Sequence, residues 1–357
     1  MNNVVIIGGG ITALSTAWEC LQRGYKTTII YKRRSGSSTR AAGGMLCPAG
    51  EADGTHESLI EMALQSCTLY PRWIATIEKH ARSKCDYRQN GTLLLALHND
   101  HYTELEHLAH FQEQYNLNSK WLSRQDIKNR EPNLASRQVG GLLCEDDHNV
   151  DPRQLQMALL SALSNNGATI QPVQTLELMI QDNQMSGVRS DSGFHHANQY
   201  ILSDGAWSSL LFDLPIRPVK GQYLLLQGAP LIQSVIRTPD VYMVPRKNGQ
   251  LYIGATMEEE GFSEHLTAGS MMDLLYHTFQ VLRGIYELKI LEHAVGFRPA
   301  LRDNQPVIGK SSVKDLWLNT AHYRHGIMLA PQAATILCNL LEGAEESIHF
   351  SATRFRQ

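Results

Sequence analysis

The spacing of apolar residues changes twice over residues 4–31. Residues 4–7 (Val-Val-Ile-Ile) form a continuous apolar run, which is typical of a strand buried on both faces of a parallel sheet. Residues 11–23 carry apolar side chains at helical spacing, and Gly24 is positioned to end that helix. Residues 27–31 return to a β-rich pattern. This order predicts a strand–helix–strand unit at the start of the chain.

The rest of the chain mixes helical patterns with short strands. Helical spacing predicts helices over residues 57–81, 102–115, 152–165, 270–286 and 326–341. β-rich runs predict strands over 91–97 and 316–320, and residues 187–203 are expected to contain a polar turn and a strand that ends at residues 204–205. Within residues 219–256 the short runs 222–226, 242–245 and 251–253 are separated by turn residues, which predicts an antiparallel sheet. We therefore expect an α/β protein in which a nucleotide-binding domain of discontinuous pieces holds an inserted α+β domain.

Composition limits the classes of partner. The formal net charge is −3, which implies no strongly basic face, so we do not expect nucleic acid or an anionic membrane as a partner. No apolar run approaches the roughly 18 residues of a spanning helix, and the N-terminus enters a strand without a signal-peptide pattern. The six cysteines form no C-x-x-C pair. We expect a soluble, cytoplasmic protein.

A glycine-rich turn joins the first strand to the first helix. Residues 8–13 (Gly-Gly-Gly-Ile-Thr-Ala) match G-x-G-x-x-[GA] in the strand-to-helix context that gives this motif weight. Gly8 would permit the tight turn, Gly10 would let a pyrophosphate approach the backbone, and Ala13 would let the helix pack closely on the sheet. The start of the helix would present free N–H groups to the phosphates. The turn predicts dinucleotide binding.

The end of the second strand departs from the usual dinucleotide pattern. An acidic residue that binds the adenosine ribose is expected there, but the sequence has Lys32, Arg33 and Arg34. A positively charged cluster suits a 2′-phosphate, so an NADP-dependent enzyme is an open alternative, and a solvated basic loop is another.

Several later segments, in order, resemble motifs of the D-amino-acid oxidase family of FAD-dependent oxidoreductases, and within it most closely the glycine oxidases of thiamin biosynthesis. The segments are residues 38–46, 150–152, 203–208, 219–221, 242–247, 254–257, 296–299, 303–309 and 322–331. The resemblance implies a Rossmann-type FAD-binding domain from residues 1–82, 139–215 and 295–357, and a substrate domain from 83–138 and 216–294. Asp204 stands where the family has a small residue, and its charge is expected to face the flavin phosphates unfavourably.

The resemblance also implies which residues bind FAD. They are Gly8, Gly10, Ile11, Thr12, Ala13, Lys32, Arg33, Thr39, Arg40, Ala41, Gly43, Gly44, Met45, Val173, Gly205, Trp207, Arg324, Gly326, Ile327 and Met328. The helix that starts at Gly326 would aim its N–H groups at the flavin C2 carbonyl and stabilise the reduced, anionic flavin.

A second set of residues is expected to hold the substrate. Arg298 would grip a carboxylate through two parallel hydrogen bonds, which fixes its orientation as well as its charge. Tyr242 would add a hydroxyl hydrogen bond to the same carboxylate. Met45 and Met257 would line a small pocket, and Arg324 would lie over the substrate or near the flavin. No acid–base residue is required, because the flavin accepts the hydride.

The expected reaction is FAD-dependent oxidative deamination of a small amino acid, glycine by resemblance. Hydride transfer to flavin N5 would give an imine, which becomes glyoxylate and ammonia or enters thiazole formation, and oxygen would reoxidise the flavin to give hydrogen peroxide. A sarcosine or D-amino-acid oxidoreductase, a quinone-linked dehydrogenase and a non-catalytic nucleotide-binding homologue are alternatives. Relatives form homo-oligomers, which the resemblance extends to this chain. No metal site is expected, because His107 and His110 lack a third ligand.

Overall fold

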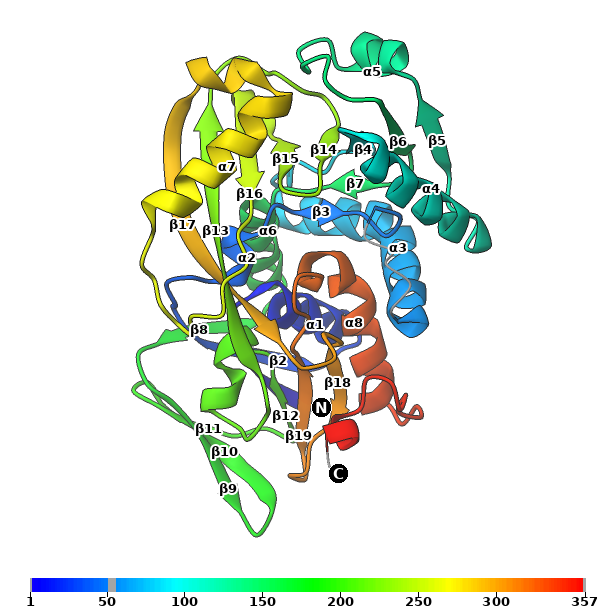
Figure 1. Cartoon of the computed structure of the whole chain (residues 1–357). Helices are drawn as coiled ribbons and strands as arrows, with labels where there is room; N and C mark the ends of the chain where they lie inside the picture. Colours follow the sequence, from blue (N-terminus) through cyan, green and yellow to red (C-terminus); the bar gives the residue numbers. More distant parts are fainter. Residues whose placement is uncertain (1, 51–55, 356–357) are drawn as a thin grey trace.

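The structure is a computed structural model that describes residues 2–50 and 56–355. Its smaller main sheet has six strands in the order β18-β19-β12-β1-β2-β8 (Figure 1). The strands are β1 (Asn3–Ile7), β2 (Lys26–Lys32), β8 (Thr169–Val173), β12 (Gln199–Leu202), β18 (Val307–Lys310) and β19 (Leu316–Thr320). Neighbouring strands run parallel, except that β18 and β19 are antiparallel.

Both faces of this sheet are covered, as the continuous apolar run in β1 predicts. Val4 and Ile6 join the core beneath the helices, whereas Val5 and Ile7 join the core on the opposite face. The helices are α1 (Ile11–Gln22), α3 (Glu57–Ala81), α6 (Pro152–Asn165) and α8 (Gly326–Leu341). The opposite face is covered in part by a three-stranded sheet of β9 (Leu176–Gln181), β10 (Gln184–Ser190) and β11 (Gly193–His195).

The larger sheet has eight strands in the order β17-β13-β16-β15-β14-β4-β6-β5. The strands are β4 (Thr92–Ala96), β5 (Ser119–Leu122), β6 (Gly140–Cys144), β13 (Arg217–Gln227), β14 (Val235–Arg237), β15 (Tyr242–Pro245), β16 (Gln250–Gly254) and β17 (Lys289–Ala300). Only the pair of β14 and β4 is parallel among the described strands of this sheet. Helix α7 (Ala268–Val281) packs on it through a shared apolar core.

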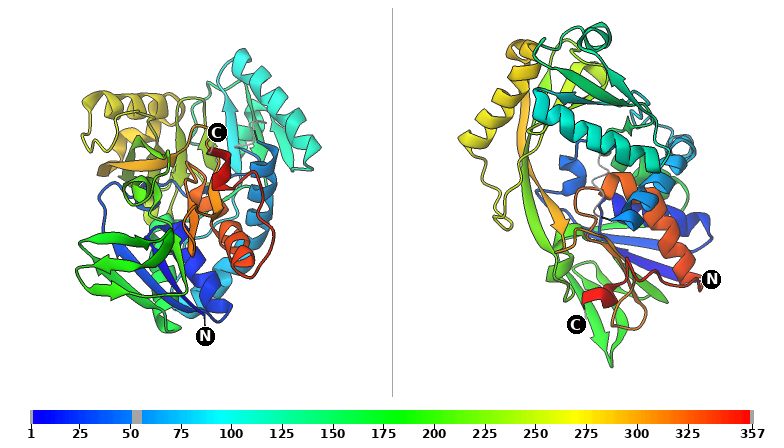
Figure 2. Two further views of the ribbon diagram at one scale, coloured as in Figure 1. Left: turned by 90° about the horizontal axis from the view of Figure 1, so that it is seen from below. Right: turned by 45° about the vertical axis from the view of Figure 1, so that its right-hand side comes forward.

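The remaining elements complete the chain, and Figure 2 shows the whole fold in two further views. They are α2 (Ser38–Ala41), β3 (Met45–Leu46), α4 (Asn99–Gln114), α5 (Arg124–Arg130), β7 (His148–Asn149) and the 3-10 turns η1 (Gly205–Leu210), η2 (Lys247–Gly249), η3 (Arg283–Glu287) and η4 (Ala352–Phe355). In the described parts of the chain, no helix is long and apolar enough to cross a membrane, and no cluster of metal ligands occurs.

The mixed α/β fold class is confirmed, with differences in single elements. The helix expected over residues 270–286 ends at Val281, because Leu282 leaves helical geometry (φ −138°, ψ 78°) and the turn η3 follows. Helix α5 was not expected, although Ser123 and Asp126 form a capping box at its start. Its single buried residue, Ile127, gave too weak an apolar pattern.

The hydrogen bonding of the sheets bears on the division into domains. Strands β6 and β17 lie in the eight-stranded sheet, whereas residues 139–215 and 295–357 were assigned to the nucleotide-binding pieces. Strand β17 pairs with β13 from Lys289 to Ala300, so it continues from one assigned piece into the next. We keep the two-domain division as a proposal in which β6 and β17 belong to the substrate domain.

Candidate active site

A cavity of about 850 Å³ lies between the two main sheets. Its walls include residues of the turns after the parallel strands β1, β2, β12 and β19, and residues of the larger sheet from β15, β16 and β17. Ligands of open parallel sheets bind outside the carboxyl ends of the strands, where the topology switches. The cavity is in that place, and it is large enough for a cofactor.

Two helices begin at the cavity, and the residue that precedes each of them makes no capping hydrogen bond through a side chain. Helix α1 starts after Gly10 and α8 starts after His325, and neither has an acidic residue in its first turn. Among the described residues, no acceptor lies within reach of the amides of Thr12 and Ala13, or of Ile327 and Met328. Amides without an acceptor at a helix start suit an anionic or carbonyl group of a ligand. The amides at the start of α1 therefore fit the pyrophosphate of a dinucleotide, and those at the start of α8 fit its ring.

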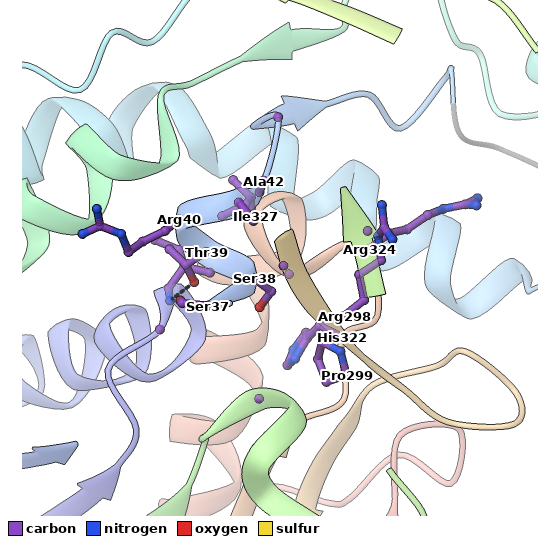
Figure 3. A pocket seen from close by; sticks show the side chains of 18 of the residues that line it. Ser37, Ser38, Thr39, Arg40, Ala42, Arg298, Pro299, His322, Arg324 and Ile327 are labelled. Carbon is purple, nitrogen blue, oxygen red and sulfur yellow. Dashed lines mark hydrogen bonds between the residues drawn. The ribbon is translucent and has the colours of Figure 1, made fainter. Parts of the chain in front are cut away.

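Most of the expected FAD-binding residues line this cavity. They are Gly10, Ile11, Thr12, Lys32, Arg33, Thr39, Arg40, Ala41, Gly43, Gly44, Met45, Gly205, Trp207, Arg324, Gly326, Ile327 and Met328. The Thr39 hydroxyl accepts a hydrogen bond from the Ile11 amide at 2.9 Å and so joins the second loop to the start of α1. Figure 3 shows Arg40 extending away from the part of the cavity that holds Arg298.

Three expected residues do not line the cavity. Gly8 has φ +135°, and a Cβ there would lie 2.2 Å from the Ser203 carbonyl oxygen, so this glycine is required by the neighbouring strand. Ala13 is fully buried in the helix core. Val173 pairs with Lys32 in the sheet, and its side chain lies in the opposite core. A contact between Val173 and adenine stays a prediction.

The charge of Asp204 is neutralised within the chain, which corrects the expected clash with phosphates. Its carboxylate accepts a hydrogen bond from Arg34 at 2.9 Å, and the side chain is only 8% exposed. Burial raises the pKa of Asp204, and Arg34 opposes that effect. The Arg34 guanidinium also lies 5.3 Å from the ring of Trp207. Arg34 was expected only as part of a basic cluster, because its partner is distant in sequence.

We expect Arg34→Met to destabilise the protein, because it leaves the buried Asp204 carboxylate without its cation. The free energy of unfolding should fall by about 3 kcal/mol. Asp204→Asn in the same background should recover a large part of that loss, because it removes the unpaired charge. Chemical denaturation of the four proteins in this double-mutant cycle measures the coupling, and additive effects would contradict the pairing.

Arg298 lies in the cavity, as expected for a carboxylate-binding residue. Its Nη1 donates to the carbonyl oxygens of Thr256 (3.1 Å) and Lys220 (3.4 Å). In the described chain, Nε and Nη2 have no acceptor, so two donors of the fork stay available for a ligand. The guanidinium packs against Gly221, where a Cβ would lie 2.4 Å from Nη1. The glycine thus makes room for this conformation.

The other expected substrate residues also line the cavity. Tyr242 stacks on Tyr252 with ring centroids 5.9 Å apart, and Met45 is partly buried beside it. Met257 is 69% exposed, and its sulfur accepts a hydrogen bond from the Tyr323 hydroxyl at 3.0 Å. Arg324 follows Tyr323, with its guanidinium 5.9 Å from that ring. Their roles toward a substrate stay predictions.

His322 is a cavity residue that sequence reasoning did not single out. The side chain is buried, and burial together with nearby His325 lowers the pKa of His322 to about 3. His322 is therefore neutral at physiological pH and adds no positive charge beside Arg298. The only sign of His322 in the sequence was its position within the segment 322–331. That position did not indicate that the side chain is buried.

Asp147 is a buried carboxyl behind the cavity wall. It accepts hydrogen bonds from the amides of Ala49 and Gly50, both at 3.2 Å, while Arg237 of the cavity wall donates to the Gly50 carbonyl at 2.7 Å. Burial raises the pKa of Asp147 to about 7. Below that pH the folded protein holds a proton there, whereas an unfolded Asp releases it near pH 4.

A pH dependence of stability follows from Asp147. Between about pH 4 and pH 7 the folded state binds more protons at this site than the unfolded state, so its contribution to stability falls as the pH rises. Asp147→Asn should remove this contribution. The free energy of unfolding of the variant should therefore rise relative to that of the wild type from pH 5 to pH 8. The exposed neighbour allows a matched control, Asp146→Asn, which should follow the wild type. Parallel curves for Asp147→Asn and the wild type would contradict the raised pKa.

Comparison with known proteins identifies the family. The family model described as FAD dependent oxidoreductase (DAO) matches residues 3–340. The chain therefore belongs to the DAO family of FAD-dependent oxidoreductases, and the cofactor of this family is FAD. The recognition made from the sequence motifs is confirmed, and the NADP alternative loses its support.

The chain is also similar to individual proteins over nearly its whole length. The chain is 31% identical to the bifunctional protein ThiO/ThiG of Trichormus variabilis over 99% of its own length but only 55% of that protein, so it spans about half of this relative. It is 27% identical to hydrogen cyanide synthase subunit HcnC of Pseudomonas aeruginosa over 99% of this chain and 96% of that one. The solved glycine oxidase of Geobacillus kaustophilus superimposes with a TM-score of 0.91, at 26% identity and 99% coverage of both chains.

Proposed function

We propose that the chain is an FAD-dependent amino acid oxidase that acts on glycine. One observation carries the proposal: the partly free fork of Arg298 faces a cavity whose walls also include amides suited to a flavin. A carboxylate held by Arg298 fixes the position of the neighbouring Cα. Similarity to solved glycine oxidases supports glycine as the amino acid.

Each residue of the site has a limited part in this proposal. When bound, the flavin supplies the hydride acceptor. Arg298 binds and orients the carboxylate, and Tyr242 adds a hydroxyl donor on the adjacent wall. Met45 and Met257 border the space beside the carboxylate. His322 is neutral and so adds no further positive charge near the amine. The chain supplies orientation and electrostatics, with no acid–base residue.

The products follow from the chemistry of the amine. Two electrons and two protons leave the CH–NH unit of the neutral amine, and oxygen takes up both pairs to become hydrogen peroxide. The imine that forms is hydrolysed by water to glyoxylate and ammonia. The fused relative named ThiO/ThiG supports the further proposal that the imine serves thiazole formation in thiamin biosynthesis. The relative named hydrogen cyanide synthase subunit favours cyanide as an alternative product from glycine.

The experiment that tests the proposal is a substrate comparison with purified, FAD-loaded protein. Peroxide, glyoxylate and cyanide are measured with glycine, sarcosine, D-alanine and L-proline under air. We expect peroxide and glyoxylate, with the largest kcat/KM for glycine. A larger value for sarcosine or D-alanine would reassign the substrate, and reduction of a quinone without peroxide would make the protein a dehydrogenase. Inactivity towards all four would leave a non-catalytic homologue.

A further inference from the structure

The segment of residues 40–44, which consists of the end of α2 and the three residues after it, has an unusual pattern of hydrogen bonds on its carbonyl side; it is called the loop 40–44 below. Every one of its five carbonyl oxygens accepts a hydrogen bond from another part of the chain. The donors are Arg153 Nε to Arg40 (2.9 Å), the Tyr252 hydroxyl to Ala41 (2.7 Å), Arg246 Nη2 to Ala42 and Gly43 (both 3.2 Å), and the Val150 amide to Gly44 (2.9 Å). The backbone of this loop is therefore fixed by side chains that lie behind it.

The opposite side of the same peptides has no such partners. In a trans peptide the N–H of a residue points away from the carbonyl before it, and the only cis bond of the described chain joins Gly254 and Ala255. The amides of Ala42, Gly43 and Gly44 therefore point away from Tyr252 and Arg246. No acceptor for these three amides occurs in the described ranges, although Gly43 and Gly44 are buried and line the cavity.

Buried amides without an acceptor indicate a ligand atom that accepts hydrogen bonds. An unpaired buried N–H is unfavourable by roughly 1–3 kcal/mol, so the two buried amides of Gly43 and Gly44, with that of the half-buried Ala42 beside them, are rarely left that way in a folded protein. Successive N–H groups directed to one side form a site for a negative or carbonyl-like atom. FAD, the cofactor of this family, presents such atoms along the edge of its ring.

Arg246 holds the central part of this arrangement. Its side chain is only 7% exposed, its Nη1 lies 3.1 Å from the Asp151 carboxylate, and its guanidinium lies 5.6 Å from the Tyr252 ring. Burial lowers the pKa of Arg246, but the group remains a cation at physiological pH. A cation on the carbonyl side strengthens the dipoles of these peptides and so makes their N–H groups stronger donors.

We propose that Arg246, together with Tyr252, is a positioning residue for the flavin: it fixes the loop 40–44 so that the amides of 42–44 donate hydrogen bonds to the edge of the flavin ring. These donors stabilise the negative charge that the ring gains on reduction. Arg246 acts through the loop and does not line the cavity. The inference rests on the FAD-binding family and does not depend on which amino acid is oxidised.

The test is the midpoint potential of the bound flavin in Arg246→Met, measured by chemical reduction against a reference dye with no amino acid present. We expect the reduced flavin to lose at least tenfold in stability relative to the oxidised flavin, which is about 30 mV for a two-electron couple. The visible spectrum should shift as well, and Arg246→Lys should be intermediate. A folded, FAD-loaded Arg246→Met with unchanged potential and spectrum overturns the proposal, even if its melting temperature falls.

Two further variants keep the test decisive. Lys247→Met alters the adjacent cation, whose side chain is 54% exposed, and should leave the potential unchanged. If Arg246→Met does not fold, Tyr252→Phe replaces it, because it keeps the ring and removes only the hydroxyl donor to Ala41. Its potential should fall in the same direction by a smaller amount. An unchanged potential in Tyr252→Phe, or an equal shift in Lys247→Met, overturns the proposal.

Discussion

Replacing Arg298 by Ala is expected to reduce kcat/KM for the amino acid by about 10²-fold or more. The change removes a charged, two-point partner of the carboxylate, an interaction of about 3 kcal/mol or more in a partly buried site. Arg298→Lys keeps the charge but loses the planar fork, so its kcat/KM should lie between those of Arg298→Ala and the wild type. Steady-state kinetics with glycine over a wide concentration range measures the effect.

The control for this prediction lies four residues away. Arg302 is exposed and is not part of the cavity wall, so Arg302→Ala should behave as the wild type. FAD content and spectrum should be the same in all variants, because Arg298 meets the substrate and not the nucleotide in our account. Wild-type kinetics in Arg298→Ala would show that another residue binds the carboxylate.

Gly8→Ala is expected to have the second large effect, on stability and FAD content. A Cβ at this position would lie 2.2 Å from the Ser203 carbonyl oxygen, and φ is +135°, where an L side chain is strained. Both problems require movement of β1 against β12, so the free energy of unfolding should fall by about 3 kcal/mol or more. Thermal unfolding and the ratio of flavin to protein after purification report the two consequences.

Gly269 offers a matched control for Gly8. It lies near the start of α7, has no neighbouring atom within 4 Å of a built Cβ, and has no positive φ. Gly269→Ala should therefore change the stability by less than about 1 kcal/mol and improve it if anything. Equal melting temperatures for Gly8→Ala and Gly269→Ala would mean that the turn between β1 and α1 tolerates a side chain.

The parts of the fold that sequence reasoning predicted well are those with strong local patterns. The apolar run before Gly8 and the amphipathic pattern of residues 57–81 define β1 and α3 with little dependence on the rest of the chain. The resemblance in motifs, and not the local pattern, led to Arg298 and the residues after His325. The sequence did not reveal the interactions between residues that are far apart in the chain. Residue spacing predicts a contact only when both residues lie on the same helix or strand.

The contacts of Asp204 and Arg246 illustrate that limit. The charge of Asp204 looked unfavourable in the sequence. Its partner, Arg34, was not recognised because it is 170 positions away in the chain. Arg246 had no role in the sequence analysis beyond its place in the segment 242–247, although it supports two carbonyls of a loop more than 200 positions earlier. In both cases the charge was plain in the sequence, but the group that it neutralises or holds depends on how β2, β12, β15 and α2 come together.

The most direct test of our central claim is the absorption spectrum of the purified protein before and after glycine is added without oxygen. A flavin bound in the cavity, with Arg298 holding the amino acid against it, predicts a yellow protein that loses its oxidised-flavin band on addition of glycine and regains it in air. A yellow protein whose spectrum does not respond to glycine would contradict the assignment of the substrate. A colourless protein that takes up no FAD would contradict the site itself.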